Sequence, residues 1–368
     1  PEKRVYGMAE AARSLGISNI DFYILNESVS RSLGNIHFVK IKNAFFPYLH
    51  YRMLFSRYNL IEENIPLDKY DRIILRYPFG DGSGQRFMET HKVITEHHTD
   101  EVSETAAKYL AASNPLKKAL RKKIYDLELS CGSDILRRAD KIIGMTDEIV
   151  SMEIRRADFS GKSRTIANGI DLSRIKHTAF KPFDGKTLTL AFVASHWQAL
   201  WHGGDRLLKS LAAYTGSVKF KLKIAGDAGE LKNSSSLNGL EIQSYGRLEG
   251  SALDEFMSEA NLAVSTLGLF RKNMQQACSL KTREYTGRGI PFVMAYDDPD
   301  LRDMPEAERF FMKIPNDESI PDANEIISFA EQMSSRKDIV SLFMRDYALS
   351  HMDWGIKVQD YINFVTAS

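Results

Sequence analysis

The feature of this sequence that most limits its fold is a repeated alternation between short apolar runs and helix-length polar segments. In the first half of the chain, apolar runs of strand length recur at residues 20–25, 36–41, 71–78, 92–98, 139–146 and 162–171. Strands separated by long crossovers pair in parallel, and the crossovers usually form helices. We therefore expect this half to be an α/β domain with a parallel sheet.

The second half repeats this alternation after residues 180–186, whose proline and glycine indicate a linker. Apolar runs follow at residues 187–194, 220–227, 240–246, 261–267 and 291–296. The expected fold class is α/β, with two Rossmann-like doubly wound parallel-sheet domains facing an interdomain cleft. Because ligands of such sheets bind beyond the carboxyl ends of the strands, we expect both sets of strand-end loops to face that cleft.

The first domain begins with a helical pattern at residues 6–16 instead of a strand. A doubly wound domain ordinarily opens with a strand that the first helix follows. We therefore expect a short upstream strand that this sequence does not contain.

Composition disfavours several classes of protein. The chain has 368 residues, 43% of them apolar, which favours two domains over one. The sequence contains no apolar run of transmembrane length and no signal-peptide pattern. Cys131 and Cys278 lie far apart and form no disulfide or metal-binding pattern. Such cysteines fit a reducing compartment, so the expected location is the cytoplasm. The net charge is +1, so we expect no nucleic-acid partner.

A helix start near Leu280 is the strongest candidate binding site in the sequence. The unpaired backbone N–H groups of a first helical turn attract phosphate, so Ser279, Leu280 and Lys281 are suited to hold a diphosphate. Glu284 lies one turn further on the same side and offers two acceptor oxygens to the hydroxyls of a ribose. A nucleotide site is one interpretation, and an ordinary surface Lys–Glu pair is the other.

Several segments together resemble family 4 glycosyltransferases of the GT-B fold, closely in the second half of the chain and loosely in the first. The resemblance is carried by IANGIDLSRI (166–175), FVASHWQALWHGGDRLLKSL (192–211), LKIAGD (222–227), YGRL (245–248) and SLKTREYTGRGIPFV (279–293). It implies an acceptor-side domain over residues 1–178, completed by a C-terminal helix at 352–368. It also implies a domain over residues 179–351 that binds a nucleotide-sugar donor.

The resemblance implies roles for residues around the helix start. Glu284 corresponds to the second glutamate of the family's pair, which holds the nucleotide ribose, and Lys281 accompanies it at the diphosphate. Gln276 stands where the family has the first glutamate, which contacts hydroxyls of the donor sugar. Glutamine keeps a carbonyl acceptor but loses the negative charge, so we expect weaker stabilisation of a cationic sugar in the transition state.

The first loop of the second domain departs from the family pattern. Where the family commonly has an arginine and, six residues later, a lysine before glycine, this chain has His196 and His202, followed by Gly203. Imidazole is only partly charged near neutral pH, so stabilisation of the leaving diphosphate would depend on pH or pass to Lys281 and Arg271. The alternative interpretations are structural packing of His202 and a solvated loop around Arg271.

Two further positions complete the expected site. The resemblance places the nucleotide base near Arg247, within residues 246–248, and a histidine near the donor sugar at the end of the strand at 92–98. That histidine corresponds to His98, with His97 as the alternative, because neighbouring strand residues face opposite ways. The sequence has no cysteine and histidine cluster with the spacing of a zinc site, so we expect no metal and no other cofactor.

The function implied by the resemblance is that of a retaining hexosyltransferase. It would move a sugar from a UDP- or GDP-linked donor to a hydroxyl of a glycan, lipid-linked or protein-linked acceptor, in the synthesis of surface polysaccharide or a glycoconjugate. Two alternatives remain open. One is another reaction of the same fold, phosphorolysis or epimerisation. The other is a catalytically weak nucleotide-sugar-binding or assembly partner, which Gln276, His196 and His202 favour.

A basic helical segment in the first domain bears on location. Residues 114–128 contain five lysines and arginines on a helical pattern. Such a helix is suited to dock on the inner face of a membrane, where lipid-linked acceptors lie, or it is an ordinary solvated helix. Peripheral attachment to the inner membrane face is therefore an alternative to a purely cytoplasmic location.

Overall fold

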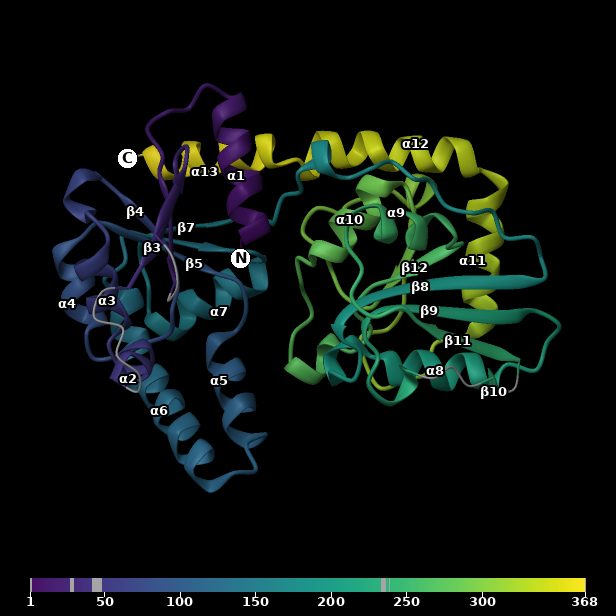
Figure 1. Ribbon diagram of the computed structural model, residues 1–368, viewed down its shortest axis with the longest axis horizontal. Coiled ribbons are helices and arrows are strands. Elements are labelled where there is room, and N and C mark those ends of the chain that lie inside the picture. The colour runs from purple at the N-terminus through teal and green to yellow at the C-terminus, as the bar shows by residue number, and fades with distance from the viewer. Residues whose placement is uncertain (1, 27–29, 42–47, 233–235, 238, 368) are drawn as a thin grey trace. The chain divides into compact units, whose positions relative to one another are not determined.

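The computed structural model describes residues 2–26, 30–41, 48–232, 236–237 and 239–367 (Figure 1). The chain divides into two compact units. Unit 1 comprises Pro1–Ala167 with Lys357–Ser368, and unit 2 comprises Asn168–Ile356. None of the helices in the described ranges is both long enough and apolar enough to cross a membrane.

Unit 2 is built on a seven-stranded sheet whose strand order is β10-β11-β9-β8-β12-β13-β14. Its strands are β8 (Thr187–His196), β9 (Lys219–Asp227), β10 (Ser236–Leu237), β11 (Leu240–Ser244), β12 (Leu262–Val264), β13 (Phe292–Met294) and β14 (Phe311–Lys313). All neighbours pair in parallel except β10 and β11. Without β10, the spatial order of the strands is third, second, first, fourth, fifth, sixth. This order is the doubly wound arrangement that the sequence predicts.

In the described part of unit 2, three helices lie between the strands, and two more follow the last strand. They are α8 (Gly204–Ala213), α9 (Gly250–Ser258), α10 (Leu280–Arg288), α11 (Ala323–Ser335) and α12 (Lys337–Tyr347), with the short 3-10 helices η3 (Leu200–His202) and η5 (Leu269–Lys272) in the loops. The central strand β8 is buried from Leu188 to Phe192, because helices cover a parallel sheet on both faces.

The strand order of unit 2 predicts where a ligand binds. The chain leaves β8 towards β9 on one side, whereas β12 pairs with β8 on the other side. The carboxyl ends of β8 and β12 therefore flank the point where the winding direction reverses, and ligands of doubly wound sheets bind at this point. The loops that leave it are residues 197–203 and 265–279.

Unit 1 contains two sheets. In the first, β4 (Ile73–Arg76), β5 (Val93–His97), β6 (Lys141–Gly144) and β7 (Lys162–Thr165) pair in parallel in chain order. In the second, β3 (Ile36–Lys40) pairs in parallel with β1 (Phe22–Asn26) and antiparallel with β2 (Arg31–Leu33). The helices are α1 (Glu2–Ser14), α2 (Tyr48–Phe55), α3 (Arg57–Asn64), α4 (Gly84–Thr90), α5 (Glu101–Leu110), α6 (Pro115–Arg137) and α7 (Asp147–Ala157).

Strands β1 and β4 each pair on one side only among the described residues. The two strands are close to each other, since the Tyr23 hydroxyl on β1 lies 2.7 Å from the hydroxyl of Tyr70, just before β4. Leu25 of β1 also packs against the same apolar cluster as Ile73 and Leu75 of β4. In unit 2, the first strand lies between the second and the fourth. The short strand that we expect before the helical pattern at residues 6–16 stays a prediction.

The last helix, α13 (Trp354–Thr366), belongs to both units, because it begins in unit 2 and its residues from Lys357 onward lie in unit 1. In unit 1, the Lys141 ammonium donates to the carbonyl oxygens of Phe364 and Val365 at 2.8 and 3.3 Å. A cation bound to the last carbonyls of a helix satisfies acceptors that have no partner within the helix. Lys141 therefore fixes the C-terminal end of α13 against β6.

Candidate functional site

The loop after β8 folds into the short helix η3, and Gly203 is then the N-cap of α8. Gly203 has a φ of +66°, and a Cβ atom there would lie 2.6 Å from the carbonyl carbon of Leu267. Both the left-handed backbone and this close approach require glycine. The start of α8 therefore packs directly against the loop that follows β12.

Backbone hydrogen bonds join these two loops. The N–H of Leu267 donates to the carbonyl of His202 at 3.0 Å, and that of Gly268 donates to the carbonyl of Trp201 at 3.2 Å. Gly268 also lies against Leu200, because a Cβ at position 268 would be 2.6 Å from the Leu200 carbonyl oxygen. Backbone hydrogen bonds and close packing thus join the loop after β8 to the loop after β12.

Lys281 of α10 meets His202 of η3 at this place. The Lys281 Nζ lies 3.3 Å from His202 Nδ1 and 5.1 Å from the centre of the Phe192 ring. Burial lowers the pKa of Lys281 to about 7. Burial and the nearby charges of Lys281 and Lys272 lower the pKa of His202 to about 3. His202 is therefore neutral, and its Nδ1 accepts a hydrogen bond from Lys281.

Helix α10 begins where the sequence predicts. Ser279 is its N-cap, and the Ser279 hydroxyl accepts a hydrogen bond from the Lys281 N–H at 3.3 Å. Leu280, the first helical residue, is 48% exposed, so the helix start is accessible. Glu284 is half-buried one turn further on. An accessible helix start with Lys281 beside it is suited to bind an anion.

A buried network that sequence reasoning missed holds α10 in place. Arg283 is fully buried and pairs with Asp298, and its Nη2 lies 2.6 Å from Asp300 Oδ2. Its Nε donates to the carbonyl of Asn168 at 3.1 Å. The N–H of Asn168 in turn donates to the sulfur of Cys278 at 2.9 Å. The NGID segment (168–171) and the LKTREY segment (280–285) are therefore in direct contact.

Cys278 takes part in this network as a neutral thiol. Burial raises the pKa of the Cys278 thiol to about 12, and its sulfur accepts the Asn168 hydrogen bond. The Asn168 side-chain amide also donates to the carbonyl of Cys278 at 3.0 Å. A thiol with so high a pKa is a poor nucleophile, so Cys278 serves packing and not covalent chemistry.

Two other predicted donor residues of unit 2, Arg271 and His196, lie next to acidic side chains of the protein. Arg271 makes two hydrogen bonds to the Asp205 carboxylate, at 2.8 and 2.9 Å, and another to Glu318 at 2.8 Å. Its guanidinium therefore ties η5 to the first turn of α8. The His196 side chain is 75% exposed, with Nδ1 3.8 Å from the Asp227 carboxylate.

The two remaining predicted residues of unit 2 lie on loops at the same edge of the sheet. Arg247 is exposed and bonds to Glu249 at 2.6 Å. Gln276 is half-buried, and its backbone forms an isolated parallel bridge with Asp297. Asp297 lies in the loop after β13. The structure thus brings His202, Gly203 and Lys281 together, and the ligand roles of all these residues stay predictions.

In unit 1, the two adjacent histidines at the end of β5 differ as strand geometry predicts. His97 is fully buried, whereas the His98 side chain is 17% exposed. His98 Nε2 lies 2.8 Å from Glu96 Oε2, two residues earlier on the same face of the strand. Burial lowers the pKa of His98, although the adjacent Glu96 raises it.

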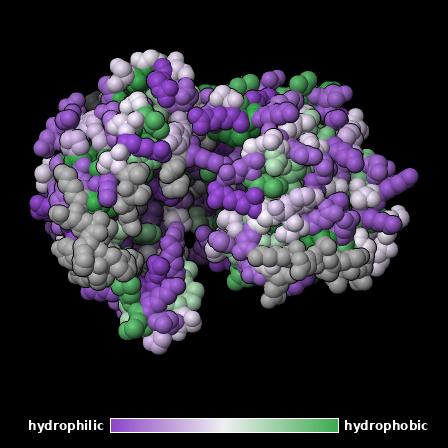
Figure 2. Space-filling view, in the orientation of Figure 1, coloured by the Kyte–Doolittle hydropathy of each residue, from purple (hydrophilic) through white to green (hydrophobic). Residues whose placement is uncertain are grey.

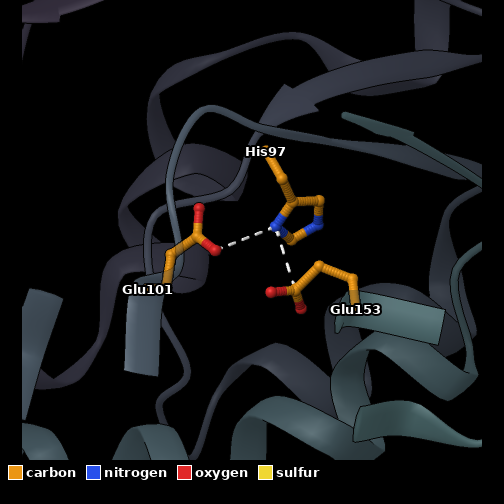
Figure 3. A group of neighbouring side chains, drawn as sticks. All are labelled: His97, Glu101 and Glu153. Carbon is orange, nitrogen blue, oxygen red and sulfur yellow. Dashed lines mark hydrogen bonds and ion pairs between the residues drawn. The ribbon is translucent and has the colours of Figure 1, made fainter. Parts of the chain in front are cut away.

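His97 belongs to a separate buried group with Glu101 and Glu153 (Figure 3). Its Nδ1 lies 3.2 Å from Glu101 Oε2 and 4.0 Å from Glu153 Oε2. Among the described residues this is the one group whose spacing suits a metal ion. However, Arg156 donates at 2.5 Å to the same Glu153 oxygen that faces His97. A bound cation would have to displace this guanidinium, so the geometry gives no support for a metal.

Comparisons with known proteins bear on the fold. No protein-family model and no curated protein sequence matches this chain. Among solved structures, sucrose-phosphate synthase from Thermosynechococcus elongatus is 14% identical, with a TM-score of 0.61 over 99% of this chain and 93% of that one. A glycosyltransferase from Rickettsia africae is 11% identical, with a TM-score of 0.60 over 99% and 95% of the two chains.

HepE from Anabaena, solved in complex with UDP and glucose, is also similar in structure. It is 12% identical, with a TM-score of 0.54 over 90% of this chain and 86% of HepE. These structures have the GT-B fold, and the similarity covers both units of the chain. The predicted fold class is therefore confirmed, whereas membership of family 4 stays a prediction.

Proposed function

We propose that this protein is a retaining glycosyltransferase whose unit 2 binds a nucleotide-diphosphate sugar, with UDP as the first nucleotide to test. The observation that carries the proposal is the accessible start of α10 at the switch point of a doubly wound sheet, with Lys281 beside it and Glu284 one turn on. The complex of HepE with UDP and glucose supports the choice of UDP, because that protein has the same fold.

In this proposal, each group at the switch point takes one part of the donor. The first-turn N–H groups of α10 and the Lys281 ammonium bind the diphosphate, and the Glu284 carboxylate accepts hydrogen bonds from the ribose hydroxyls. Gln276 contacts hydroxyls of the sugar, Arg247 lies near the base, and His98 of unit 1 contacts the sugar during transfer.

The reaction exchanges one bond of the sugar carbon C1 for another. The bond between C1 and the diphosphate oxygen breaks, and a bond forms between C1 and the acceptor hydroxyl oxygen on the same face of the ring. The proton of that hydroxyl passes to the departing diphosphate. Lys281 and the helix start stabilise the negative charge that develops on the leaving group. This chain needs no metal for that role, because an ammonium and backbone dipoles supply the positive potential.

Ligand-induced stabilisation tests donor binding. A ligand present at about 100 times its dissociation constant stabilises the folded state by about 2.7 kcal/mol, so UDP or a UDP-sugar is expected to raise Tm by several degrees. The Glu284→Ala variant is expected to lose most of this shift, while Arg302→Ala, on an exposed pair with Asp303, keeps it. A screen in which UDP, GDP and their sugars all leave Tm unchanged refutes the proposal.

A binding protein with weak catalysis is the second candidate, and it rests on two observations. Gln276 lacks the charge of a glutamate, and the second histidine of the loop, His202, is neutral. If the purified protein binds UDP-sugars but transfers none to any acceptor extract, while Gln276→Glu gains turnover, this candidate is correct. Product analysis with and without phosphate separates transfer from phosphorolysis and epimerisation.

We also propose that the acceptor is presented at an anionic membrane surface. Helices α5 and α6 form a hairpin that extends from the rest of unit 1 (Figure 1), and Figure 2 shows hydrophobic residues among hydrophilic ones at its end. Leu110 and Leu116 are 69% and 83% exposed there. The lysines and arginines beside them on α6 are Lys117, Lys118, Arg121, Lys122 and Lys123. Exposed leucines next to a cationic helix suit the interface of an anionic bilayer.

Vesicle flotation tests this surface. Each lysine or arginine near an anionic bilayer contributes about 1 kcal/mol, and each buried leucine about 1.5–3 kcal/mol. Binding to phosphatidylglycerol vesicles is therefore expected to exceed binding to phosphatidylcholine vesicles and to fall in Leu110→Ser/Leu116→Ser. The matched control is Leu342→Ser on α12, where the leucine is 59% exposed. If Leu110→Ser/Leu116→Ser binds anionic vesicles as well as Leu342→Ser does, the end of the α5–α6 hairpin is not the membrane-binding surface.

A further inference from the structure

A buried carboxylate on β5 connects His98 to two other segments of unit 1. Glu96 is 3% exposed, and its Oε2 lies 2.8 Å from His98 Nε2. Arg4 of α1 donates to both oxygens of Glu96, at 2.8 and 2.5 Å. The Tyr361 hydroxyl of α13 donates to Oε1. Arg4 and Tyr361, which are far apart in the sequence, therefore meet at one side chain of β5.

The hydrogen-bonding capacity of this carboxylate is fully used. A carboxylate offers about four acceptor positions. On Oε1 they face Arg4 and Tyr361, and on Oε2 they face Arg4 and His98. Arg4 is in turn held by Tyr361, whose hydroxyl accepts from its Nη2 at 2.8 Å. The carboxylate can neither rotate nor exchange partners without losing a charge-assisted hydrogen bond.

The same contacts keep Glu96 ionised. Burial alone would raise the pKa of Glu96, but Arg4 and His98 lower it well below its usual range. An ionised carboxylate only accepts hydrogen bonds, so the Nε2 of His98 must carry the proton that lies between them. Neutral His98 then presents Nδ1 as an unprotonated acceptor.

We propose that Glu96, held by Arg4 and Tyr361, is a positioning residue that fixes the ring orientation and the tautomer of His98. The inference rests on the proposed function, in which His98 contacts the donor sugar. It assigns Nδ1 as the atom that accepts a hydrogen bond from a sugar hydroxyl. It also gives α13 an indirect part in the site, because Tyr361 acts on His98 through Glu96.

The charged and titratable groups around His98 come from four elements. Arg4 on α1, Arg76 on β4 and Glu96 on β5 act on His98 itself, whereas Tyr361 on α13 contacts Glu96. Glu96 is the one group among these that raises the pKa of His98, whereas Arg4 and Arg76 lower it. Replacing Glu96 by glutamine is therefore expected to lower the pKa of His98 further and to let both tautomers form.

Nitrogen NMR of the imidazoles tests the tautomer directly, without any need for activity. The His98 signals are assigned by their loss in His98→Gln. In the unaltered protein at neutral pH, we expect a protonated Nε2 and an unprotonated Nδ1. In Glu96→Gln we expect a mixture of tautomers. A His98 that is protonated on Nδ1 in the unaltered protein, or unchanged in Glu96→Gln, overturns the proposal.

Kinetics then separate a positioning role from a merely structural one. Glu96→Gln is expected to lower kcat about tenfold or more with an unchanged KM for the donor, because imidazole function depends on the tautomer. In a His98→Ala background the same change is expected to have no further effect, since contacting residues are not additive. An equal loss of kcat in both backgrounds contradicts the inference.

Two further variants distinguish the loss of positioning from a loss of activity through misfolding. Glu96→Gln leaves Arg4 with a weaker buried partner, so Tyr361→Phe provides a milder change, with an expected loss of a few-fold in kcat and the same dependence on His98. The matched control is Arg164→Ala, which removes a 3.1 Å bond between β7 and Asp360 of α13 but no contact of His98. It is expected to keep kcat within twofold. Absence of transfer with a normal UDP-induced rise in Tm and the expected tautomer would refute catalysis while leaving the positioning of His98 intact.

Discussion

Lys281, which we propose binds the donor diphosphate, has an unusual pKa for a lysine. Burial lowers its pKa to about 7, so near neutral pH a large fraction of the side chain is uncharged in the absence of ligand. Below pH 7 the ammonium is already present when the ligand arrives. Above pH 7 the protein must take up a proton to bind with full charge.

Donor affinity is therefore expected to fall as pH rises above 7. The loss approaches tenfold per pH unit while Lys281 is neutral in the free protein and charged in the complex. Calorimetry of UDP binding in two buffers with different ionisation enthalpies measures the proton uptake. Lys281→Arg is expected to bind UDP with little pH dependence over this range, since arginine stays charged. An affinity for UDP that is constant between pH 7 and pH 9 in the unaltered protein contradicts this assignment.

Gly203 combines a constrained backbone with a place in the proposed ligand site. Alanine there would combine a left-handed φ, which costs about 1–3 kcal/mol, with a Cβ only 2.6 Å from the Leu267 carbonyl carbon. We expect Gly203→Ala to destabilise the protein by more than this range and to weaken UDP binding, because η3 and the start of α8 must separate from the loop after β12.

A matched control for this variant exists at Gly250. It also has a positive φ, of +56°, but a Cβ there meets no atom within 4 Å. Gly250→Ala is expected to show the backbone cost alone, and the difference between the two urea midpoints then measures the clash. Equal destabilisation of both variants would show that the contact with Leu267 relaxes without cost.

Helix α10 depends on its buried ion pair more than on its own sequence. It has nine residues, fewer than an isolated helix needs, so tertiary contacts must hold it in place. Arg283 and Asp298 are both 0% exposed. Removing one partner of a buried pair leaves an uncompensated charge and costs about 3–5 kcal/mol.

Arg283→Met is therefore expected to lower the free energy of unfolding by about this amount and to abolish UDP binding. The matched control is Arg13→Ala, which removes a pair to Glu10 in which the two side chains are 56% and 44% exposed. Exposed pairs contribute about 0–1 kcal/mol, so this control is expected to stay near the unaltered protein. Chemical denaturation followed by circular dichroism gives both values. A loss below 1 kcal/mol in Arg283→Met would mean that the pair does not anchor α10.

The elements that the sequence predicts well are those defined by local patterns. Apolar runs locate the parallel strands, and Ser279 marks the start of α10 within one residue. The contacts that sequence reasoning missed join residues that local patterns do not connect. Arg283 pairs with Asp298 beyond the next strand, and Glu96 meets Tyr361 near the end of the chain. Arg271 shows the same limit, because its partners Asp205 and Glu318 come from two distant segments.

The division into two units gives the whole molecule two reporters of folding. All three tryptophans of the chain, Trp197, Trp201 and Trp354, lie in unit 2. Trp197 and Trp354 are buried, so their fluorescence changes when unit 2 unfolds. Far-UV circular dichroism reports on the helices of both units. Proteins with more than one domain commonly unfold in more than one step, and a ligand stabilises the part to which it binds.

Saturating UDP is therefore expected to shift the tryptophan transition to higher temperature by more than it shifts the circular dichroism transition. The physical reason is that the proposed donor groups at the switch point all belong to unit 2, whereas unit 1 has its own sheets and buried core. Glu284→Ala is expected to remove the difference between the two signals. If UDP moves both signals by the same amount, the two units unfold as one cooperative body, and UDP binding then stabilises unit 1 as well.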